Sequence, residues 1–377
     1  MRALLIGAGH AHLAVVRHAA RLRAQGVELC LISPPRFQYS GLATAVLSGA
    51  LPPAAGEIDV ARLAAAFGVA FHASDVVDID REGRRVRLQD GTALPYDVLS
   101  LNIGSQTADP AGLGAEEDVW TVKPLSQLLD LRQRLERGLA RTGRCPDLVV
   151  AGAGQAGFEV AAALAGLCER SGAAPRISLV GQLADAAWAP ATAMQRLRTE
   201  LVRRGVTFVD SRVTARGRDA CRLASGADMA CNILVLATGL TAPDLGQGLG
   251  LPVDPQGRLL TSDNLQAIGD AQVFAVGDCA VLASRHRPCA GVFGVRAAPI
   301  LAFNLGAIAR GQRLKTYQPQ GAWLSIMDLG DGTGLALRGG QWWFGRTALW
   351  LKRRLDLGFI RQMSAAPAGR AGQLHRR

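Results

Sequence analysis

The feature that most constrains the fold is a glycine-rich motif near the middle of the chain. Residues 148–159 read LVVAGAGQAGFE, so four apolar residues run into a complete GxGxxG at Gly152, Gly154 and Gly157, and a helix-like stretch follows. In a dinucleotide-binding unit the first glycine allows the tight turn, the second lets the backbone approach a pyrophosphate, and the third lets helix and strand pack closely. The helix N-terminus then faces the phosphates. This context predicts a Rossmann unit rather than a glycine-punctuated buried helix.

A second, earlier phosphate loop opens the chain. Residues 3–6 are apolar and strand-like, and the loop that follows reads GAGHAH, with Gly7 and Gly9 in the expected places. His12 stands where the third glycine is expected, so either the helix lies further from the strand or the imidazole fills the gap. His10 and His12 could also be read as metal ligands, but no cluster of cysteine or aspartate accompanies them, and we predict no metal site.

In each of the two predicted units, the residue at the end of the second strand says little about which nucleotide binds there. In a Rossmann unit an acidic residue at this point holds the ribose hydroxyls, and an arginine nearby accommodates the 2′-phosphate of NADP. The strand at residues 27–32 ends at Ser33, which can still hydrogen-bond a ribose, though more weakly. The strand at residues 176–180 of the second unit ends at Gly181 and Gln182. The sequence therefore leaves the choice between NADH and NADPH open.

Cysteine use and charge suggest a location. The seven cysteines form no CxxC pair and are odd in number, so a disulfide framework is improbable and a reducing cytoplasm fits. A strand begins within the first few residues, which argues against a signal peptide, and no apolar run makes a clean membrane span. The net charge of the whole chain is +11, and the last 37 residues alone have a net charge of +7. This concentration suggests an anionic surface as partner, and nothing in the sequence predicts a nucleic-acid partner.

The basic C-terminal segment has the spacing of an amphipathic helix. Trp343 and Trp350 flank the boundary between its two faces. Its apolar face comprises Ala348, Leu351, Leu355, Phe359 and Met363, and its basic face comprises Arg346, Arg353, Arg354 and Arg361. Such a helix can lie in a membrane interface, where each basic residue near an anionic leaflet contributes ~1 kcal/mol. The alternative is that the apolar face packs on the rest of the protein.

Four motifs carry a resemblance to a known family. They are GAGHAHL at residues 7–13, YDVLSLNIGS at 96–105, ILVLATG at 233–239 and VFAVGDCA at 273–280. The chain resembles the two-dinucleotide-binding flavoproteins, that is, the pyridine nucleotide–disulfide oxidoreductase group with its type II NADH dehydrogenases and sulfide:quinone reductases. More narrowly, it is similar to a subfamily that occurs alone or fused N-terminal to selenophosphate synthetase. The resemblance covers almost the whole chain.

The resemblance implies FAD on the first unit and NAD(P)H as co-substrate on the second. The implied FAD-binding residues are Gly7, Gly9, His10, His12, Ser33, Ser40, Val76, Gly104, Gly277 and Asp278. The implied NAD(P)H-binding residues are Gly152, Gly154, Gly157, Thr238 and Gly239. Asp278 would hydrogen-bond the ribityl chain, and Ser33 would face the adenosine ribose. Glu159 would lie near the nicotinamide, where we treat it as a candidate catalytic residue.

The predicted fold class is α/β, with two Rossmann-like dinucleotide-binding domains, the second inserted in the first, and a small C-terminal α+β region. A chain of 377 residues that is 49% hydrophobic can form several cores. The predicted limits are an FAD-binding domain at residues 1–115 and 256–315, an inserted NAD(P)H-binding domain at 116–255, a C-terminal interface or membrane-facing region at 316–363 and a polar tail at 364–377.

The sequence also departs from the family pattern. Residues 34–56 contain no cysteine, which excludes the redox disulfide of the glutathione-reductase branch. Related sequences have lysine near Cys289 and glutamine at Ala297, two positions that approach the flavin in the family. Cys289 is therefore a second candidate catalytic residue, whereas we expect Cys279 to be a small packed residue.

These features predict a peripheral, cytoplasm-facing, FAD-dependent NAD(P)H dehydrogenase that passes electrons to a second acceptor, with a quinone favoured. A thiol-, sulfide- or selenium-linked flavoprotein oxidoreductase is one alternative. A non-catalytic FAD/NAD redox sensor, from another functional class, is the other. The sequence leaves the oligomeric state open.

Overall fold

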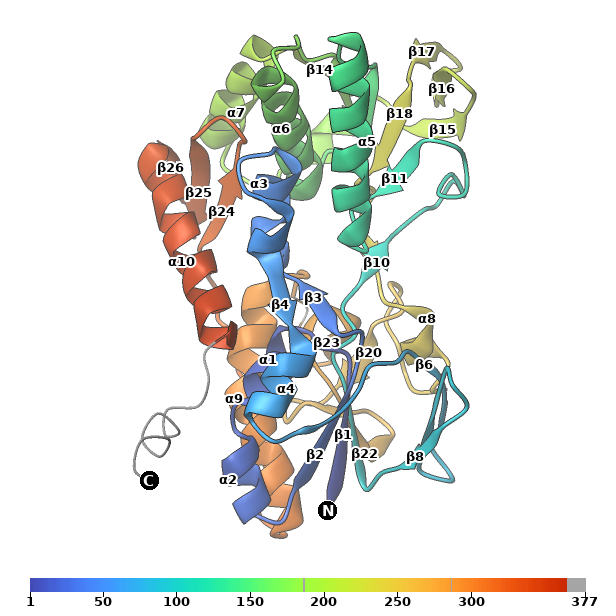
Figure 1. Cartoon of the computed structure of the whole chain (residues 1–377), viewed down its shortest axis with the longest axis vertical. Coiled ribbons are helices and arrows are strands. Elements are labelled where there is room, and N and C mark those ends of the chain that lie inside the picture. Colours follow the sequence, from blue (N-terminus) through green and yellow to red (C-terminus); the bar gives the residue numbers. More distant parts are fainter. Residues whose placement is uncertain (186, 286, 365–377) are drawn as a thin grey trace, which may run out of the picture.

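The structure is a computed structural model that describes residues 1–185, 187–285 and 287–364. Two lobes lie one above the other, and the C-terminal segment runs along one side of both (Figure 1). Of the predicted polar tail, residues 364–377, only Ser364 lies within the described residues.

The first lobe is built on an eight-stranded sheet with the strand order β23-β20-β21-β22-β9-β1-β2-β5. The neighbours from β22 to β5 are parallel, as expected for a Rossmann unit. The strands are β1 (Arg2–Ile6), β2 (Glu28–Ile32), β5 (Ala70–His72), β9 (Val98–Leu101), β20 (Leu259–Thr261), β21 (Gln266–Ala267), β22 (Asp270–Ala275) and β23 (Ala280–Leu282).

The two faces of this sheet are covered differently, because successive side chains of a strand point to opposite sides. Leu5 and Leu31 pack with the helices on one face, and Leu4 and Ile32 pack with an antiparallel meander on the other. The helices of this lobe are α1 (His10–Val16), α2 (Ala19–Ala24), α4 (Val60–Ala66) and α9 (Gly291–Ala309). The meander is β6 (Val76–Asp80), β7 (Arg85–Leu88) and β8 (Ala93–Pro95), and a small pair, β3 (Arg36–Gln38) with β4 (Glu57–Asp59), lies above α4.

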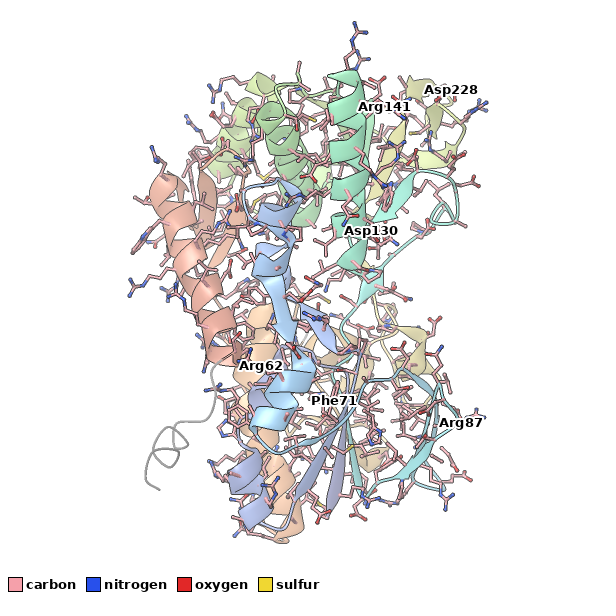
Figure 2. All side chains as sticks on the ribbon, viewed as in Figure 1. Arg62, Phe71, Arg87, Asp130, Arg141 and Asp228 are labelled. Atoms are coloured by element: carbon pink, nitrogen blue, oxygen red, sulfur yellow. The ribbon has the colours of Figure 1, made fainter. Side chains whose placement is uncertain are left out.

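The second lobe repeats this design on a five-stranded, all-parallel sheet in the order β11-β18-β12-β13-β14. The strands are β11 (Val119–Thr121), β12 (Leu148–Ala151), β13 (Ile177–Gly181), β14 (Val206–Asp210) and β18 (Ile233–Leu236). The helices are α5 (Ser126–Thr142), α6 (Gln155–Arg170) and α7 (Ala191–Arg203), and the meander is β15 (Val213–Arg216), β16 (Ala220–Leu223) and β17 (Asp228–Ala230). Val150 faces the helices and Val149 the meander. In Figure 2, Arg87 and Asp228 mark the two meanders at the edge of the molecule.

The second lobe is inserted in the first. The chain leaves the first sheet after β9 and re-enters it at β20. The two crossings lie side by side, because β10 (Gln106–Thr107) pairs antiparallel with β19 (Leu240–Thr241). The fold class predicted from the order of the two glycine loops is therefore confirmed.

The remaining helices of the two lobes are the short α3 (Ala43–Leu47) and α8 (Asp244–Gln247), and the 3₁₀ turns are η1 (Ser40–Leu42), η2 (Pro53–Gly56), η3 (Leu183–Asp185) and η4 (Gly277–Cys279).

The C-terminal region links the two lobes. It consists of an antiparallel sheet, β24 (Ser325–Asp328), β25 (Gly334–Arg338) and β26 (Gln341–Gly345), followed by α10 (Arg346–Ser364). Met327 and Leu335 of the sheet belong to the core of the second lobe. Met363, near the end of α10, belongs to the core of the first. The region is thus part of the packed structure and not a detachable appendage.

The buried face of α10 differs from the predicted one. Ala348 and Met363 are buried as expected, but the stripe between them is filled by Lys352 and Asp356. Leu355, which was assigned to the apolar face, is 53% exposed. The reason is a polar contact: Lys352 donates to the Gly41 carbonyl at 2.7 Å, and Asp356 accepts from the Tyr39 hydroxyl at 2.9 Å.

Among the described residues, α9 alone is long and apolar enough to cross a membrane. Half of the most apolar stretch of α9 is buried inside the protein, and the helix packs along α1 in the core of the first lobe. Buried core helices meet the same criterion, so this finding by itself is weak evidence for a span.

Arg204, just after α7, fastens the C-terminal sheet to α6. Its guanidinium pairs with both oxygens of Glu169 at 2.8 and 2.9 Å and donates to the carbonyls of Ala162 at 3.2 Å and Leu329 at 2.5 Å. The Arg204 side chain is 6% exposed. Because buried charges are costly without partners, this cluster depends on every one of its contacts.

We expect Arg204→Met to lower the free energy of unfolding by about 2–4 kcal/mol, because it leaves Glu169 and two carbonyl oxygens without their donor. Urea denaturation followed by circular dichroism measures the change. The matched control is Arg203→Met, which removes a neighbouring side chain that is 70% exposed and should change stability by less than about 0.5 kcal/mol. Equal effects of the two substitutions would contradict this account.

Candidate functional site

Two cavities open at the junction of the lobes. The first, of about 680 Å³, lies in the first lobe, and the second, of about 730 Å³, lies in the inserted lobe. Both volumes are within the range of roughly 300–1,000 Å³ that is usual for cofactor sites. Ser40, Lys123 and Leu125 line both cavities, so the two spaces adjoin.

The first cavity lies at the carboxyl ends of parallel strands, where α/β sheets bind their ligands. The loops after β1, β9 and β22 converge there, and β2 and β6 supply the far end. Nine of the ten residues predicted for FAD line it, namely Gly7, Gly9, His10, Ser33, Ser40, Val76, Gly104, Gly277 and Asp278. Gly104 has a φ of +76° with open space where a side chain would project, which leaves a smooth backbone wall.

Asn102, at the end of β9, joins the loops around this cavity and was not singled out from the sequence. Its Oδ1 accepts from the amides of Ala11 and His12 at 3.0 and 3.2 Å, and its Nδ2 donates to the Val276 carbonyl at 2.8 Å. An added Cβ at Gly9 would lie 2.4 Å from this side-chain oxygen. The first glycine loop therefore packs directly against the side-chain amide of Asn102. The only sequence signal was the polar residue at the end of a buried strand.

His12 is the tenth predicted residue, and the structure corrects its place. The side chain is fully buried behind the loop, with Nδ1 2.7 Å from the Gly7 carbonyl and Nε2 2.8 Å from the Ser100 hydroxyl. The imidazole fills the gap that a third glycine would leave, and it does not reach the cavity. Burial lowers the pKa of His12 to about 4.

His10, in contrast, lines the cavity within an aromatic cluster. Its ring lies 5.4 Å from the rings of Phe37, Tyr39 and Phe359. Burial lowers the pKa of His10 to about 4, with nearby Asp278 opposing the shift. A neutral imidazole therefore faces the cavity at physiological pH, and α10 supplies part of its surroundings through Phe359.

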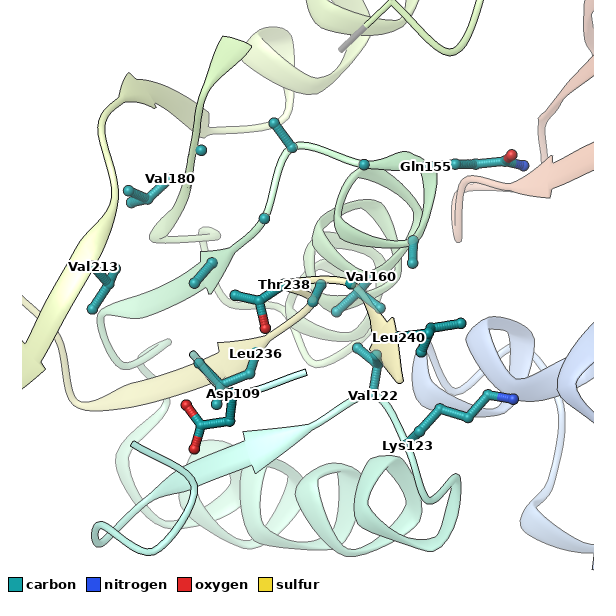
Figure 3. Close-up of a pocket in the computed structure, with 18 of the residues that line it drawn as sticks. Asp109, Val122, Lys123, Gln155, Val160, Val180, Val213, Leu236, Thr238 and Leu240 are labelled. Atoms are coloured by element: carbon teal, nitrogen blue, oxygen red, sulfur yellow. The ribbon is translucent and has the colours of Figure 1, made fainter. Parts of the chain in front are cut away.

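The second cavity is framed by the central glycine motif, and Figure 3 shows its lining. Gly152 has a φ of +125°, and a Cβ there would lie 2.1 Å from the Ala237 carbonyl oxygen. A Cβ at Gly154 would meet nothing within 4 Å, so this backbone is open to a ligand. Gly157 lies behind the cavity, where a Cβ would be 1.9 Å from the Gly152 carbonyl oxygen. No side chain caps α6, whose N-terminus opens at the loop.

The other residues predicted for this site also line it. Thr238 and Gly239 follow β18 at the cavity wall. Glu159 lines it at the inner end, where its Oε1 accepts from the Thr44 hydroxyl at 2.8 Å and from the Asp328 amide at 3.0 Å. Burial raises the pKa of Glu159, with Lys352 opposing the shift.

Lys123 stands at the junction of the cavities and was missed from the sequence. Its Nζ lies 3.5 Å from Oδ2 of Asp278, which also accepts from the Ser105 hydroxyl at 3.2 Å. Asp278 comes from the first lobe and Lys123 from the chain entering the second. Nothing in the local sequence places this pair together, since 155 residues separate the two.

The two cysteines near this region are not at the cavity surface. Cys279 is 1% exposed and packs against the carbonyls of Leu101 and Val276, as expected of a small packed residue. Cys289 is outside the cavity lining, with its Sγ 3.8 Å from the Arg258 guanidinium and 3.9 Å from the Asp278 carbonyl oxygen. Burial raises the pKa of both thiols, which disfavours the reactive thiolate.

Acid sensitivity is expected from the buried histidine. Because burial holds His12 neutral in the folded protein, its contribution to stability is fully present above pH 6.5. That contribution is lost as pH falls from 6.5 to about 4, because over this range the unfolded chain binds a proton that the folded protein does not. We expect His12→Gln to flatten the fall of the unfolding free energy between these pH values by up to about 1.4 kcal/mol per pH unit. Denaturant titrations at several pH values measure the slope, and an unchanged slope would refute the assignment.

Two of the three glycines in the central motif allow binding and folding to be tested separately. Gly154→Ala should keep the melting temperature, because its Cβ enters open space, but should weaken nucleotide binding at least ~10-fold by keeping the pyrophosphate away from the backbone. Gly157→Ala should lower the melting temperature by several degrees, because its Cβ overlaps a carbonyl oxygen. Calorimetry and nucleotide titration measure the two effects, and the same phenotype in both variants would contradict this division.

Comparison with known proteins places the chain in a family. An NADH dehydrogenase-like protein of Mycobacterium tuberculosis is 32% identical over 226 residues, and the match spans 56% of each chain, so only about half the length of that relative is matched. The demethylphylloquinone reductase NdbB of a Synechocystis species is 28% identical over 309 residues, or 77% of this chain and 76% of that protein.

Solved structures share the fold. The sulfide:quinone oxidoreductase of Aquifex aeolicus superposes with a TM-score of 0.79 at 17% identity, over 97% of this chain and 93% of that one. The NDH2 of Plasmodium falciparum, in complex with NADH, has a TM-score of 0.76 at 14% identity, over 97% and 99%. The model of the pyridine nucleotide-disulphide oxidoreductases matches residues 1–298. The predicted resemblance is confirmed, and the chain belongs to the pyridine nucleotide-disulphide oxidoreductase family, with FAD as its cofactor.

Proposed function

We propose that this protein is an FAD-dependent NAD(P)H dehydrogenase that delivers electrons to a quinone. One observation carries the proposal: two glycine-framed cavities, one in each lobe, adjoin at Ser40, Lys123 and Leu125. A pyridine nucleotide in the second cavity and a flavin in the first would meet at this junction. FAD bound there supplies hydride acceptance and onward electron transfer, and the protein supplies binding, orientation and electrostatics.

The first cavity suits FAD in the chemistry of its walls. The Gly7–Gly9 loop would hold the pyrophosphate. A Cβ at either glycine would collide with Asn102, so the loop has no side chain at these two positions and its backbone can approach the phosphates. Ser33 would face the ribose, although its hydroxyl already donates to the Pro34 carbonyl at 2.9 Å. Asp278 would hydrogen-bond the ribityl chain, with Lys123 holding its carboxylate in place.

The second cavity suits a pyridine nucleotide. Gly152 and Gly154 would hold the pyrophosphate at the uncapped N-terminus of α6, where the helix dipole favours negative charge. Glu159 would orient the nicotinamide end, because Thr44 and the Asp328 amide fix its carboxylate at the inner wall. We propose residues 116–255 as the unit that binds this nucleotide.

We favour a quinone as the acceptor, because one of the relatives is named as a demethylphylloquinone reductase. Thiol or sulfide chemistry would need a reactive thiol at the cavity. Cys279 is packed away, and Cys289 lies outside the lining with a raised pKa. Cys289→Ser is therefore expected to leave quinone-dependent turnover intact.

We propose that α10 rests on an anionic membrane surface. Its outward side carries Trp350, 62% exposed, and Leu355, 53% exposed, together with the exposed Arg346, Arg354 and Arg361. Trp343, 37% exposed, lies on β26, the adjoining strand. Aromatic, aliphatic and basic side chains in this mixture suit a lipid interface on the cytoplasmic side.

Anaerobic stopped-flow spectroscopy tests the redox proposal. We expect NADPH or NADH to bleach the visible absorbance of the oxidised flavin and a soluble quinone to restore it. Failure of both nucleotides to bleach the flavin would sink the dehydrogenase proposal. Bleaching without recovery by quinones, disulfides or selenium compounds would favour a redox sensor.

Liposome sedimentation tests the membrane proposal. The variant Trp350→Ser with Leu355→Ser should lose most of its binding to vesicles containing anionic lipid, because it removes the apolar contact and leaves the fold intact. The matched control is Val202→Ser, which alters an exposed apolar side chain of α7, a helix outside the C-terminal region, and the side chain is 58% exposed. Equal sedimentation of all three proteins would show that α10 does not bind the membrane.

A further inference from the structure

We propose that this dehydrogenase selects NADPH, and that Arg212 is the residue that recognises its 2′-phosphate. The inference rests on the proposed function, because it concerns the nucleotide of the same cavity. It concerns a choice that the sequence leaves open. Arg212 follows β14, and so it lies outside the strand–helix–strand segment in which a selectivity residue is normally sought.

The outer end of the second cavity is formed by the ends of two neighbouring strands. Because β13 and β14 are parallel, the residues after them, Gln182 and Ser211–Arg212, emerge at the same edge of the sheet and line the cavity together. An Arg212 guanidinium N–H donates to the side-chain oxygen of Gln182. In Figure 3 the nearby Val180 and Val213 lie at the opposite end of the cavity from Lys123. This end would receive the adenosine half of a nucleotide whose nicotinamide lies at the junction.

The carboxylates around the second cavity either bind backbone amides or lie away from its outer end. Recognition of NADH normally uses an acidic side chain that accepts from the 2′-hydroxyl. Asp210 is close in the chain, but it is outside the cavity lining and its Oδ1 accepts from the Leu183 amide at 2.9 Å. Asp109 lines the cavity, with both oxygens accepting from backbone amides, and Glu159 lies at the inner end. Within the described residues, no carboxylate of the lining is thus placed for the ribose.

The charge at this end favours a phosphate. A phosphate monoester carries nearly two negative charges at neutral pH, and a guanidinium can bind it with two parallel hydrogen bonds. Arg212 is exposed at the cavity edge, held toward it by Gln182, and so can turn to a ligand without breaking a buried contact. Arg198 is outside the cavity lining and donates to the carbonyl of Leu183, the residue after Gln182, at 3.4 Å. The neutral Gln182 neither repels the phosphate nor binds the diol strongly.

Flavin reduction with the two nucleotides tests the proposal. For the holoenzyme we expect the second-order rate constant with NADPH to exceed that with NADH by about ten- to a hundred-fold, the range for charge-assisted hydrogen bonds. Arg212→Gln should remove most of this preference by slowing NADPH and leave NADH nearly unchanged. Gln182→Glu should favour NADH, because the new carboxylate accepts from the ribose and engages Arg212.

A matched control separates the local contact from general electrostatics. Arg218→Gln removes one positive charge from the exposed turn between β15 and β16, outside the cavity lining, and should keep the NADPH preference. Inhibition by 2′,5′-ADP compared with 5′-ADP gives a readout that needs no hydride transfer. The wild type should bind 2′,5′-ADP more tightly, and Arg212→Gln should bind the two about equally.

The outcomes are distinguishable. Reduction by both nucleotides at equal rates, or an Arg212→Gln effect of the same size on NADH and NADPH, overturns the role of Arg212 and leaves the dehydrogenase proposal standing. If neither nucleotide reduces the flavin, the dehydrogenase proposal fails. In that case, a preference for 2′,5′-ADP that is lost in Arg212→Gln still supports the 2′-phosphate site, and equal binding of the two analogues rejects it.

Discussion

The side-chain amide of Asn102 is the contact on which the first cavity depends. It ties the amides that open α1 to the backbone after β22, through two hydrogen bonds on one side and one on the other. Those two segments are far apart in the chain, and the parallel strands β1, β9 and β22 bring them to one edge of the sheet. A side chain larger than glycine at position 9 would displace this amide, so the loop sequence and the amide constrain each other.

The two lobes have the same arrangement of sheet, helices and meander, and the C-terminal region packs against both of them. Each lobe has a sheet whose central strands are parallel, with helices on one face and a three-stranded meander on the other. The C-terminal sheet packs on the second lobe through Arg204, while α10 reaches the first lobe through Lys352 and Asp356. Relative motion of the lobes would break these contacts. The region therefore holds the two cavities at a common junction and leaves the outer side of α10 exposed.

Charge is distributed along the adjoining cavities in a consistent way. Lys123 and Asp278 pair at the junction, Glu159 lies at the inner end of the second cavity, and Arg212 lies at its outer end. The protonation of the buried groups follows their surroundings, since burial keeps His10 and His12 neutral and raises the pKa of Glu159. In the proposed function, this arrangement would favour a nucleotide with its phosphates toward Arg212 and its nicotinamide ring toward the junction.

The two Rossmann units, their order, the family and most of the cavity glycines could be predicted from the amino-acid sequence. These features are local: a strand, a turn that only glycine fits and a helix N-terminus lie within about fifteen residues of one another. The positions of Lys123 and Arg212, the burial of His12 behind its loop and the buried stripe of α10 became clear only from the folded structure. Each of these depends on partners distant in sequence, such as Asp278 for Lys123 and Tyr39 for Asp356. Periodicity predicted an amphipathic α10, but it could not predict that a buried Lys–Asp pair would replace leucine at the interface.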